Sequence, residues 1–201
     1  MIGKFLVSAT FIALLAVPAW AQNAPPVRIR GTVDKFDGDK LTIKARDGMD
    51  MTVALTEKTR IGFLVKKSLA DIKPGDFLAS AGVKGTDGKI HALEVRILPQ
   101  TAAATGGRQA PWDQGPGSVM TDATVGTVTE TPQGKVVHVK FKGGESEYSI
   151  GPDVPVLASA PGDKSLLKPG AAVFVVAPKG PDGGLTAAFM YIEKDGIKPP
   201  L

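Results

Sequence analysis

The chain contains no cysteine and only two histidines, His91 and His138. The lack of cysteine excludes disulfides, thiolate metal sites and cysteine nucleophiles. Two histidines also exclude most zinc sites. Aromatic residues are scarce at 6%, whereas 24 glycines and 16 prolines among 201 residues are typical of short strands joined by tight turns.

Sequence motifs for catalysis are absent as well. The chain has no G-x-S-x-G, no H-E-x-x-H and no phosphate-binding glycine loop. Asp34, Asp37 and Asp39 cluster near one turn, but they lack the distal glutamate of a calcium loop. Neither histidine stands in a recognisable arrangement with Ser or Asp. We therefore interpret the protein as a non-enzyme without a catalytic residue.

The first 21 residues have the pattern of a secretory signal peptide. Lys4 precedes an apolar stretch of Phe5 to Val17, which is short for a membrane span. Pro18 ends that stretch, and Ala19-Trp20-Ala21 is a small-x-small cleavage site. The alternative is an uncleaved anchor. We predict cleavage near Ala21 and a periplasmic or secreted mature chain that is not a transmembrane protein.

The rest of the chain matches itself when it is shifted by 95 residues. The matches concentrate at Gly and Pro, where backbone geometry dictates the residue. We predict a tandem repeat with residues 22–99 as the first unit, 100–121 as a flexible linker and 122–201 as the second unit with a short C-terminal tail. The turn residues expected to be structural are Pro74, Gly75, Asp87 and Gly88, with their counterparts Pro169, Gly170, Asp182 and Gly183.

Each unit alternates apolar and polar residues in five segments, with a short helical turn before Lys-Pro-Gly. Three strands, a helical turn and two more strands is the order of a small OB-like barrel. The fold prediction is therefore all-β, with two tandem five-stranded OB-like barrels. Val137 and Val139 look inward in the second unit, one position off Leu41 and Ile43 of the first.

A resemblance follows from these motifs. The signal peptide, the Gly-x-Val opening strand, the apolar-Lys-Pro-Gly-Asp segment of 72–76 and the closing Asp-Gly hairpin resemble exported bacterial small-barrel domains of unknown function. The resemblance covers both units, and the second departs from it at Ala171, where the first has Asp76. It implies a fold and a compartment but no chemistry.

Positive charge is concentrated in the first unit, and the second has an excess of Asp and Glu. Strand alternation predicts one outward face that carries Arg28, Arg30, Lys44 and Arg46. Such a patch indicates either an anion or membrane-surface site or an ordinary solvated face. It lacks the interleaved aromatic rings of single-strand nucleic-acid binders, so we expect no nucleic-acid partner. Trp112 stands alone in the linker, and its large apolar area favours docking onto a domain.

One set of residues has soft-metal character. Met49 and Met51 lie two apart on a predicted strand, and His91 begins the fifth strand. In an OB-like order the third and fifth strands are neighbours, so the three side chains are predicted to meet at one barrel mouth. Two thioethers and an imidazole suit Cu(I) or Ag(I). The alternative is that the methionines pack the core and His91 is a rim residue.

Two functional hypotheses follow from the sequence. The first is a non-catalytic periplasmic protein that binds an envelope protein or a small ligand. The second is a Cu(I) or Ag(I) carrier that uses the first barrel, with no other cofactor.

Overall fold

The structure is a computed structural model that describes residues 25–199. The predicted signal peptide lies outside the described residues. None of the helical turns in the described part of the chain is long and apolar enough to cross a membrane.

Strands dominate the described chain, which confirms the all-β prediction. The first half holds β1 (Val27–Asp37), β2 (Lys40–Ala45), β3 (Asp50–Ala54), β4 (Arg60–Lys67), the 3-10 turn η1 (Leu69–Asp71), β5 (Phe77–Lys84) and β6 (Ile90–Leu98). Next come η2 (Gln100–Thr105), β7 (Arg108–Pro111), β8 (Ser118–Thr131), β9 (Gly134–Phe141) and β10 (Gly144–Ile150). The last elements are β11 (Val156–Pro161), η3 (Lys164–Leu166), β12 (Ala172–Ala177) and β13 (Phe189–Ile192).

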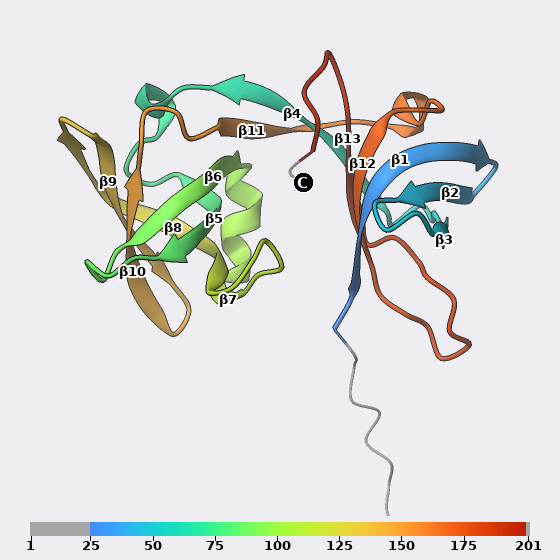
Figure 1. The fold of residues 1–201 in the computed structure, drawn as a ribbon, viewed down its shortest axis with the longest axis horizontal. Coiled ribbons are helices and arrows are strands. Elements are labelled where there is room, and N and C mark those ends of the chain that lie inside the picture. The colour runs from blue at the N-terminus through green and yellow to red at the C-terminus, as the bar shows by residue number, and fades with distance from the viewer. Residues whose placement is uncertain (1–24, 200–201) are drawn as a thin grey trace, which may run out of the picture.

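Five strands close into a barrel, seen on the left of Figure 1. β6, β5, β8, β9 and β10 are neighbours in that order, and β10 returns to pair in parallel with β6. The closing pairs are Tyr148 with Ile90 and Ser149 with His91. Tyr148 is buried inside this barrel, and its hydroxyl donates to Thr121 Oγ1 at 2.6 Å. Its core also contains Val95, Val137 and Ile150.

A second group of strands lies on the right of Figure 1. Its order is β13, β12, β1, β2 and β3, and all these pairs are antiparallel. An isolated parallel bridge joins Ala54 at the end of β3 to Thr186, which precedes β13. Leu41, Ile43 and Val173 are fully buried in the core of this group.

β4 and β11 connect the two groups, and they run antiparallel to each other across the top of Figure 1. β4 also pairs with β13, and β11 pairs with β6, in both cases in parallel. The chain therefore leaves the second group through β4 and returns to it through β11.

This pairing differs from the grouping that the sequence predicted. β5 and β6 belong to residues 22–99, yet they close a barrel with β8, β9 and β10. β1 pairs instead with β12 from residues 122–201. The alternation pattern identified the five strands predicted for each unit but not β4, β7 and β11, and it carries no information on which copy of a closing strand each opening strand pairs with.

The segment 100–121 is also more ordered than the expected flexible linker. It contains η2 and β7, and β7 pairs with β8 along Arg108 to Pro111. Glycines at 106 and 107 take positive φ and end η2. Backbone pairing to β8 fixes this segment against the closed barrel.

The ungapped repeat alignment fails in the first hairpin. Val33 pairs with Ile43 just before a β-bulge, and Val125 pairs with Val139 just before the corresponding bulge. Val125 is thus the counterpart of Val33 in strand register, although the ungapped alignment matched Val33 with Val128. Bulges occur in both hairpins, so a bulge does not account for the one-position offset of Val137 and Val139.

The predicted turn glycines lie in left-handed conformations. Gly75 has φ 90° and Gly170 φ 86°, as a turn after a φ-locked proline requires. The Gly75 amide donates to Val125 O, and the Gly170 amide donates to Val33 O. Gly88 and Gly183 also have positive φ, at 80° and 83°. Each Lys-Pro-Gly turn therefore fastens onto the opening strand of the other predicted unit.

A cleft between the two strand groups as candidate functional site

A cleft of about 630 Å³ lies between the two strand groups. Its first wall is one face of the sheet formed by β1, β12, β13 and β4. Directly opposed residues on neighbouring strands share a face, and two such rows meet here. The first row is Arg28, Val176, Phe189 and Arg60, and the second is Arg30, Phe174, Tyr191 and Gly62.

The aromatic residues of this wall form a connected set of rings. Phe174 and Phe189 have centroids 6.0 Å apart, and Phe189 and Tyr191 are 5.8 Å apart, both edge to face. The Arg60 guanidinium carbon lies 5.8 Å from the Phe189 ring centre. The wall therefore has an aromatic centre with arginines at both ends.

The second wall comes from the closed barrel. One row across its strands is Arg96, Ala79, Asp122 and Arg108, and the next is Glu94, Ala81, Met120 and Ala110. Its apolar members are small, except for Met120. Arg96 has only 6% of its side chain exposed, and its guanidinium carbon lies 5.7 Å from the Tyr191 ring centre across the cleft.

The cleft exists because the two walls differ in side-chain volume. With the 95-residue offset, Ala79 and Ala81 occupy positions whose counterparts are Phe174 and Val176. A phenylalanine facing a phenylalanine would fill this space, whereas an alanine facing a phenylalanine leaves room. Ala79 lines the cleft, as do Phe174 and Val176.

The segment after β7 borders the cleft, and its Trp112 is one of the lining residues. Trp112 docks here, as its area favoured, with its ring 6.4 Å from that of Phe174 and the Arg28 guanidinium carbon 4.3 Å from its ring centre. Its indole Nε1 is buried and has no hydrogen-bond partner among the described residues. The next residue, Asp113, accepts two hydrogen bonds of 2.8 Å from Arg30.

Among the described residues that line the cleft, arginines outnumber carboxylates. Arg28, Arg60, Arg96 and Arg108 line it, and Asp122 is the one carboxylate among the described lining residues. Asp122 lies 3.8 Å from Arg108, and burial raises the pKa of its carboxyl despite the opposing effects of Arg108 and Arg96. In the part of the chain that the structure describes, no carboxylate lies within ion-pair distance of Arg60. The cleft therefore carries a net positive charge.

Arg96 has its own carboxylate on the same face of β6. Glu94 Oε1 lies 2.8 Å from Arg96 Nε, and the two form a buried ion pair. Burial raises the pKa of the Glu94 carboxyl, and the charge of Arg96 only partly opposes this effect. Arg96 Nη2 also contacts the Met120 sulfur at 3.9 Å. The charge of Arg96 is therefore already balanced by Glu94. Among the arginines that line the cleft, Arg28 and Arg60 are more available to a bound anion.

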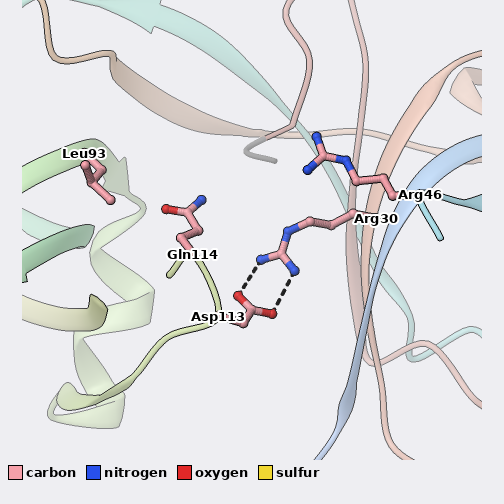
Figure 2. A pocket seen from close by; sticks show the side chains of 5 residues that line it. All are labelled: Arg30, Arg46, Leu93, Asp113 and Gln114. Carbon is pink, nitrogen blue, oxygen red and sulfur yellow. Dashed lines mark hydrogen bonds and ion pairs between the residues drawn. The ribbon is translucent and has the colours of Figure 1, made fainter. Parts of the chain in front are cut away.

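A second hollow, of about 490 Å³, adjoins the Arg30–Asp113 pair. Figure 2 shows Arg30 and Arg46 on one side of it, Leu93 on the closed barrel opposite, and Asp113 with Gln114 between them. The carboxylate of Asp113 thus stands at an opening between the strand groups.

The structure divides the cationic patch that the sequence predicted. Arg28 lines the cleft, Arg46 lines the second hollow, and Arg30 lies in the wall and also lines that hollow. Lys44 lies opposite Thr32 on the same hairpin, is exposed, and lines neither of these two spaces. The expected shared face is present, and Arg28 and Arg30 on it contact Asp113 and Trp112, while Arg46 lines the adjoining hollow.

The structure does not bring Met49, Met51 and His91 together, because β3 and β6 do not pair with each other. Met51 lies on β3 opposite Ile43 and packs against the second group's core, and Met49 is 58% exposed. His91 lies on β6, opposite Val83 of β5 and Ser149 of β10. The third and fifth strands do pair, but each takes its partner from the other copy, so the residue bridged to β3 is Thr186. His91 Nε2 instead lies 3.1 Å from Asp87 Oδ1.

A bulge explains a further error in the fifth strand. Strand alternation over residues 93–97 predicts that Leu93 faces inward together with Val95. Ala81 pairs with Glu94 and Gly82 with Ala92, so Leu93 is the extra residue of a bulge and is 44% exposed.

Sequence reasoning missed the aromatic wall entirely. Phe189 and Tyr191 are two apart and share a face of β13, which was the available signal. Phe174 lies in the run Ala172–Ala177, where both faces are largely buried, so alternation gave no direction.

The architecture defines an all-β protein with a closed five-stranded barrel and further strands that enclose an arginine-rich, aromatic cleft. Comparison of the chain with protein-family models, with curated proteins and with solved structures found no match. The resemblance to exported small-barrel domains therefore stays a prediction.

Proposed function

We propose that the protein is a non-catalytic binding protein of the cell envelope, and that its ligand is a small organic anion with an apolar or aromatic body. The ligand lies in the cleft between the aromatic wall and Ala79. Its acid group is held by arginine at the rim. Export to the periplasm rests on the predicted signal peptide.

The observation that carries this proposal is that one cleft combines an aromatic wall with an excess of positively charged side chains. Phe174, Phe189 and Tyr191 supply flat apolar area, and the lining arginines outnumber the lining carboxylate among the described residues. Apolar surface gives affinity, and a few charged groups fix orientation. A neutral ligand would leave Arg60 without a counter-charge among the described residues, and a cation would be repelled by the net positive charge of the cleft.

The volume supports a ligand of modest size. Pockets for small molecules usually span roughly 300–1,000 Å³, and this cleft is about 630 Å³. A folded protein domain or an ordered helix is too large for such a space. The cleft therefore favours a small ligand over an envelope protein.

The proposal also treats the two strand groups as copies of one five-stranded unit that have exchanged their last two strands. The Ala54–Thr186 bridge corresponds, at the 95-residue offset, to the Ser149–His91 pair that closes the barrel. Ile61–Met190 corresponds in the same way to Val156–Val95. Duplication followed by divergence of one wall supplies the cleft without any new strand.

Two dyes of one skeleton test the proposal. 8-Anilinonaphthalene-1-sulfonate carries a sulfonate, and N-phenyl-1-naphthylamine is its uncharged analogue. We expect saturable binding of one sulfonated dye per chain to residues 22–201, weakened by added salt, and weaker binding of the uncharged dye. No saturable binding of either dye, or equal affinity for both, would overturn the proposal.

A matched pair of variants locates the binding. Ala79→Leu adds volume inside the cleft and should reduce affinity for the sulfonated dye roughly tenfold or more, because it closes the space opposite Phe174. Ala104→Leu adds the same volume at an exposed position of η2 that does not line the cleft, so it should leave affinity unchanged. Thermal melts of both variants verify that the fold is kept.

A further inference from the structure

We propose that Arg28, Arg30 and Arg46 form the subsite for the ligand's acid group, and that Asp113 occupies this subsite as the chain's own carboxylate until a ligand displaces it. This inference rests on the proposed function and adds to it which arginines hold the acid group and what regulates access to them. Asp113 competes with the ligand for these arginines within the same chain, and this competition lowers the apparent affinity for anions.

The geometry of Asp113 is that of a bound carboxylate ligand. Both carboxylate oxygens accept hydrogen bonds from one guanidinium, Nη1 and Nη2 of Arg30, at 2.8 Å each. This fork arrangement is how arginine binds carboxylates in general. Arg28 Nη1 lies 4.0 Å from the same carboxylate, so it contributes charge without a short bond. The two partners are 83 residues apart in sequence and come from different strand groups.

The place is accessible to a ligand from outside. The Arg30 side chain is 13% exposed, but Asp113 is 37% exposed and borders the second hollow. Arg46 faces that hollow as a third cation (Figure 2). Arg30 and Arg28 therefore face a single carboxylate, and Arg46 lines the same hollow, so a ligand with a sulfonate, phosphate or carboxylate would meet positive charge from all three.

The segment that carries Asp113 has fixed ends and a glycine-rich middle. Pro111 is paired to Val119, and the Ser118 hydroxyl donates to the carbonyls of Trp112 and Gly115. Between these points Gly115 and Gly117 adopt φ 122° and 70°. Because Trp112 precedes Asp113 and stacks against Arg28, a displaced Asp113 would change the surroundings of the indole. Trp112 is the single tryptophan of residues 22–201, so its emission reports on this segment.

Asp113→Asn tests the competition directly. The amide keeps the shape of the side chain and removes its charge. We expect affinity for 8-anilinonaphthalene-1-sulfonate to rise about three- to tenfold at low salt, with unchanged affinity for N-phenyl-1-naphthylamine. Asp153→Asn, an exposed carboxylate in the turn before β11, makes the same charge change elsewhere and should leave both affinities unchanged.

The outcomes separate this inference from the proposed function. If wild type and Asp113→Asn bind the sulfonated dye equally well, the subsite assignment is wrong and the cleft proposal stands. If both dyes bind more tightly to the variant by the same factor, Asp113 only closes the segment over the cleft, and the inference also fails. If neither dye binds either protein, the proposed function itself fails.

A measurement on the wild-type protein covers the case in which the variant does not fold. Burial raises the pKa of the Asp113 carboxyl, but the hydrogen bonds and charge of Arg30, together with Arg28, lower it below its ordinary value. Displacement by the sulfonated dye removes those bonds. The ¹³C resonance of the Asp113 carboxyl should then titrate at higher pH with the dye bound, and an unchanged titration would refute the displacement.

Discussion

Leu64 of β4 lies directly opposite Ser159 of β11, and the two residues are counterparts at the 95-residue offset of the predicted repeat. The ladder around them is antiparallel, from Val156 opposite Lys67 to Pro161 opposite Gly62. Corresponding segments therefore meet each other at the point where the chain passes between the strand groups. An approximate twofold relationship between the groups follows from this one pair.

The crossing at β4 and β11 has a consequence for fragments of the chain. Residues 22–99 contain β5 and β6 but not β8, β10 and β11, with which these two strands also pair, and residues 118–201 contain β12 without its partner β1. We expect each fragment alone to lack a cooperative thermal transition, because its core is incomplete. An equimolar mixture should recover the circular dichroism and the melt of the full chain.

Independent folding of the two fragments would contradict this expectation. If each fragment folds cooperatively by itself, then β4 and β11 can turn back and let each unit use its own closing strands. The division into 22–99 and 122–201 that the sequence predicted would then be correct for the isolated units.

The two Lys-Pro-Gly turns should be sensitive to any side chain. A Cβ at Gly75 or Gly170 would meet nothing within 4 Å, so the cost of Ala arises from the positive φ alone. We expect Gly75→Ala and Gly170→Ala each to lower the free energy of unfolding by about 1–2 kcal/mol. Gly151→Ala is the control, since its nearest contact is 3.9 Å and its φ is not positive. Equal urea midpoints for all three variants would contradict the turn assignment.

Tyr148 should make stability fall at alkaline pH. Burial raises the pKa of the Tyr148 hydroxyl to about 12, an effect that the hydrogen bond to Thr121 only partly opposes. Between pH 10 and 12 the unfolded chain loses this proton while the folded chain retains it, so the unfolded state binds fewer protons and stability declines as pH rises. The difference in the free energy of unfolding between wild type and Tyr148→Phe, measured by urea denaturation at each pH, should show this decline. A difference that stays constant from pH 8 to pH 11.5 would contradict it.

Tyr148→Phe should also be less stable at neutral pH. The hydroxyl joins β10 to Thr121 on β8 and to the Ser80 carbonyl on β5, at 2.6 and 3.2 Å. Removing it takes this contact from the buried Ser80 carbonyl, while Thr121 Oγ1 keeps Gln109 Nε2 as a donor, so we expect the free energy of unfolding to fall by about 0.5–1.5 kcal/mol. Urea denaturation at pH 7 measures this loss, and a variant as stable as wild type would show that the hydroxyl contributes nothing to the barrel.

The four cations predicted as one patch should differ in their effect on anion binding. Arg28→Ala removes a group that contacts Trp112 and lines the cleft, whereas Lys44 lines neither the cleft nor the second hollow. We expect Arg28→Ala to weaken sulfonated-dye binding at least threefold and to shift Trp112 emission, with Lys44→Ala close to wild type in both. Equal weakening by the two variants would favour a diffuse surface potential over a defined site.

Met51 should be a packing residue and not a metal ligand. Its strand and that of His91 have no pairing with each other, and Met51 packs against the core around Ile43. Met51→Leu conserves volume and should cost less than about 1.5 kcal/mol. Competition with a chromophoric Cu(I) chelator should give the same result for wild type and Met51→Leu. A loss of stoichiometric Cu(I) binding in the variant would restore the metal-carrier hypothesis.

Local patterns in the sequence were sufficient for the turns and for most strands, but not for β4, β7 and β11. Alternation located β1 and β2, and the inward set of Val137 and Val139 is confirmed by their burial. Gly75 and Gly170 were predictable because Pro-Gly is typical of a type II turn, whose third residue needs φ > 0. The bulge at Leu93 was not predictable, since an extra residue in one strand depends on the partner across the ladder.

The sequence by itself determined the all-β class, the five alternating strand segments of each half, the turn glycines and the cationic character of the hairpin that carries Arg28 and Arg30. Only the tertiary structure decided which strands pair, because two similar copies offer each opening strand two equivalent closing partners. That choice separates Met51 from His91 and sets Ala79 across from Phe174. The cleft arises from a difference in volume between facing walls, and no local pattern along the chain encodes which walls face each other.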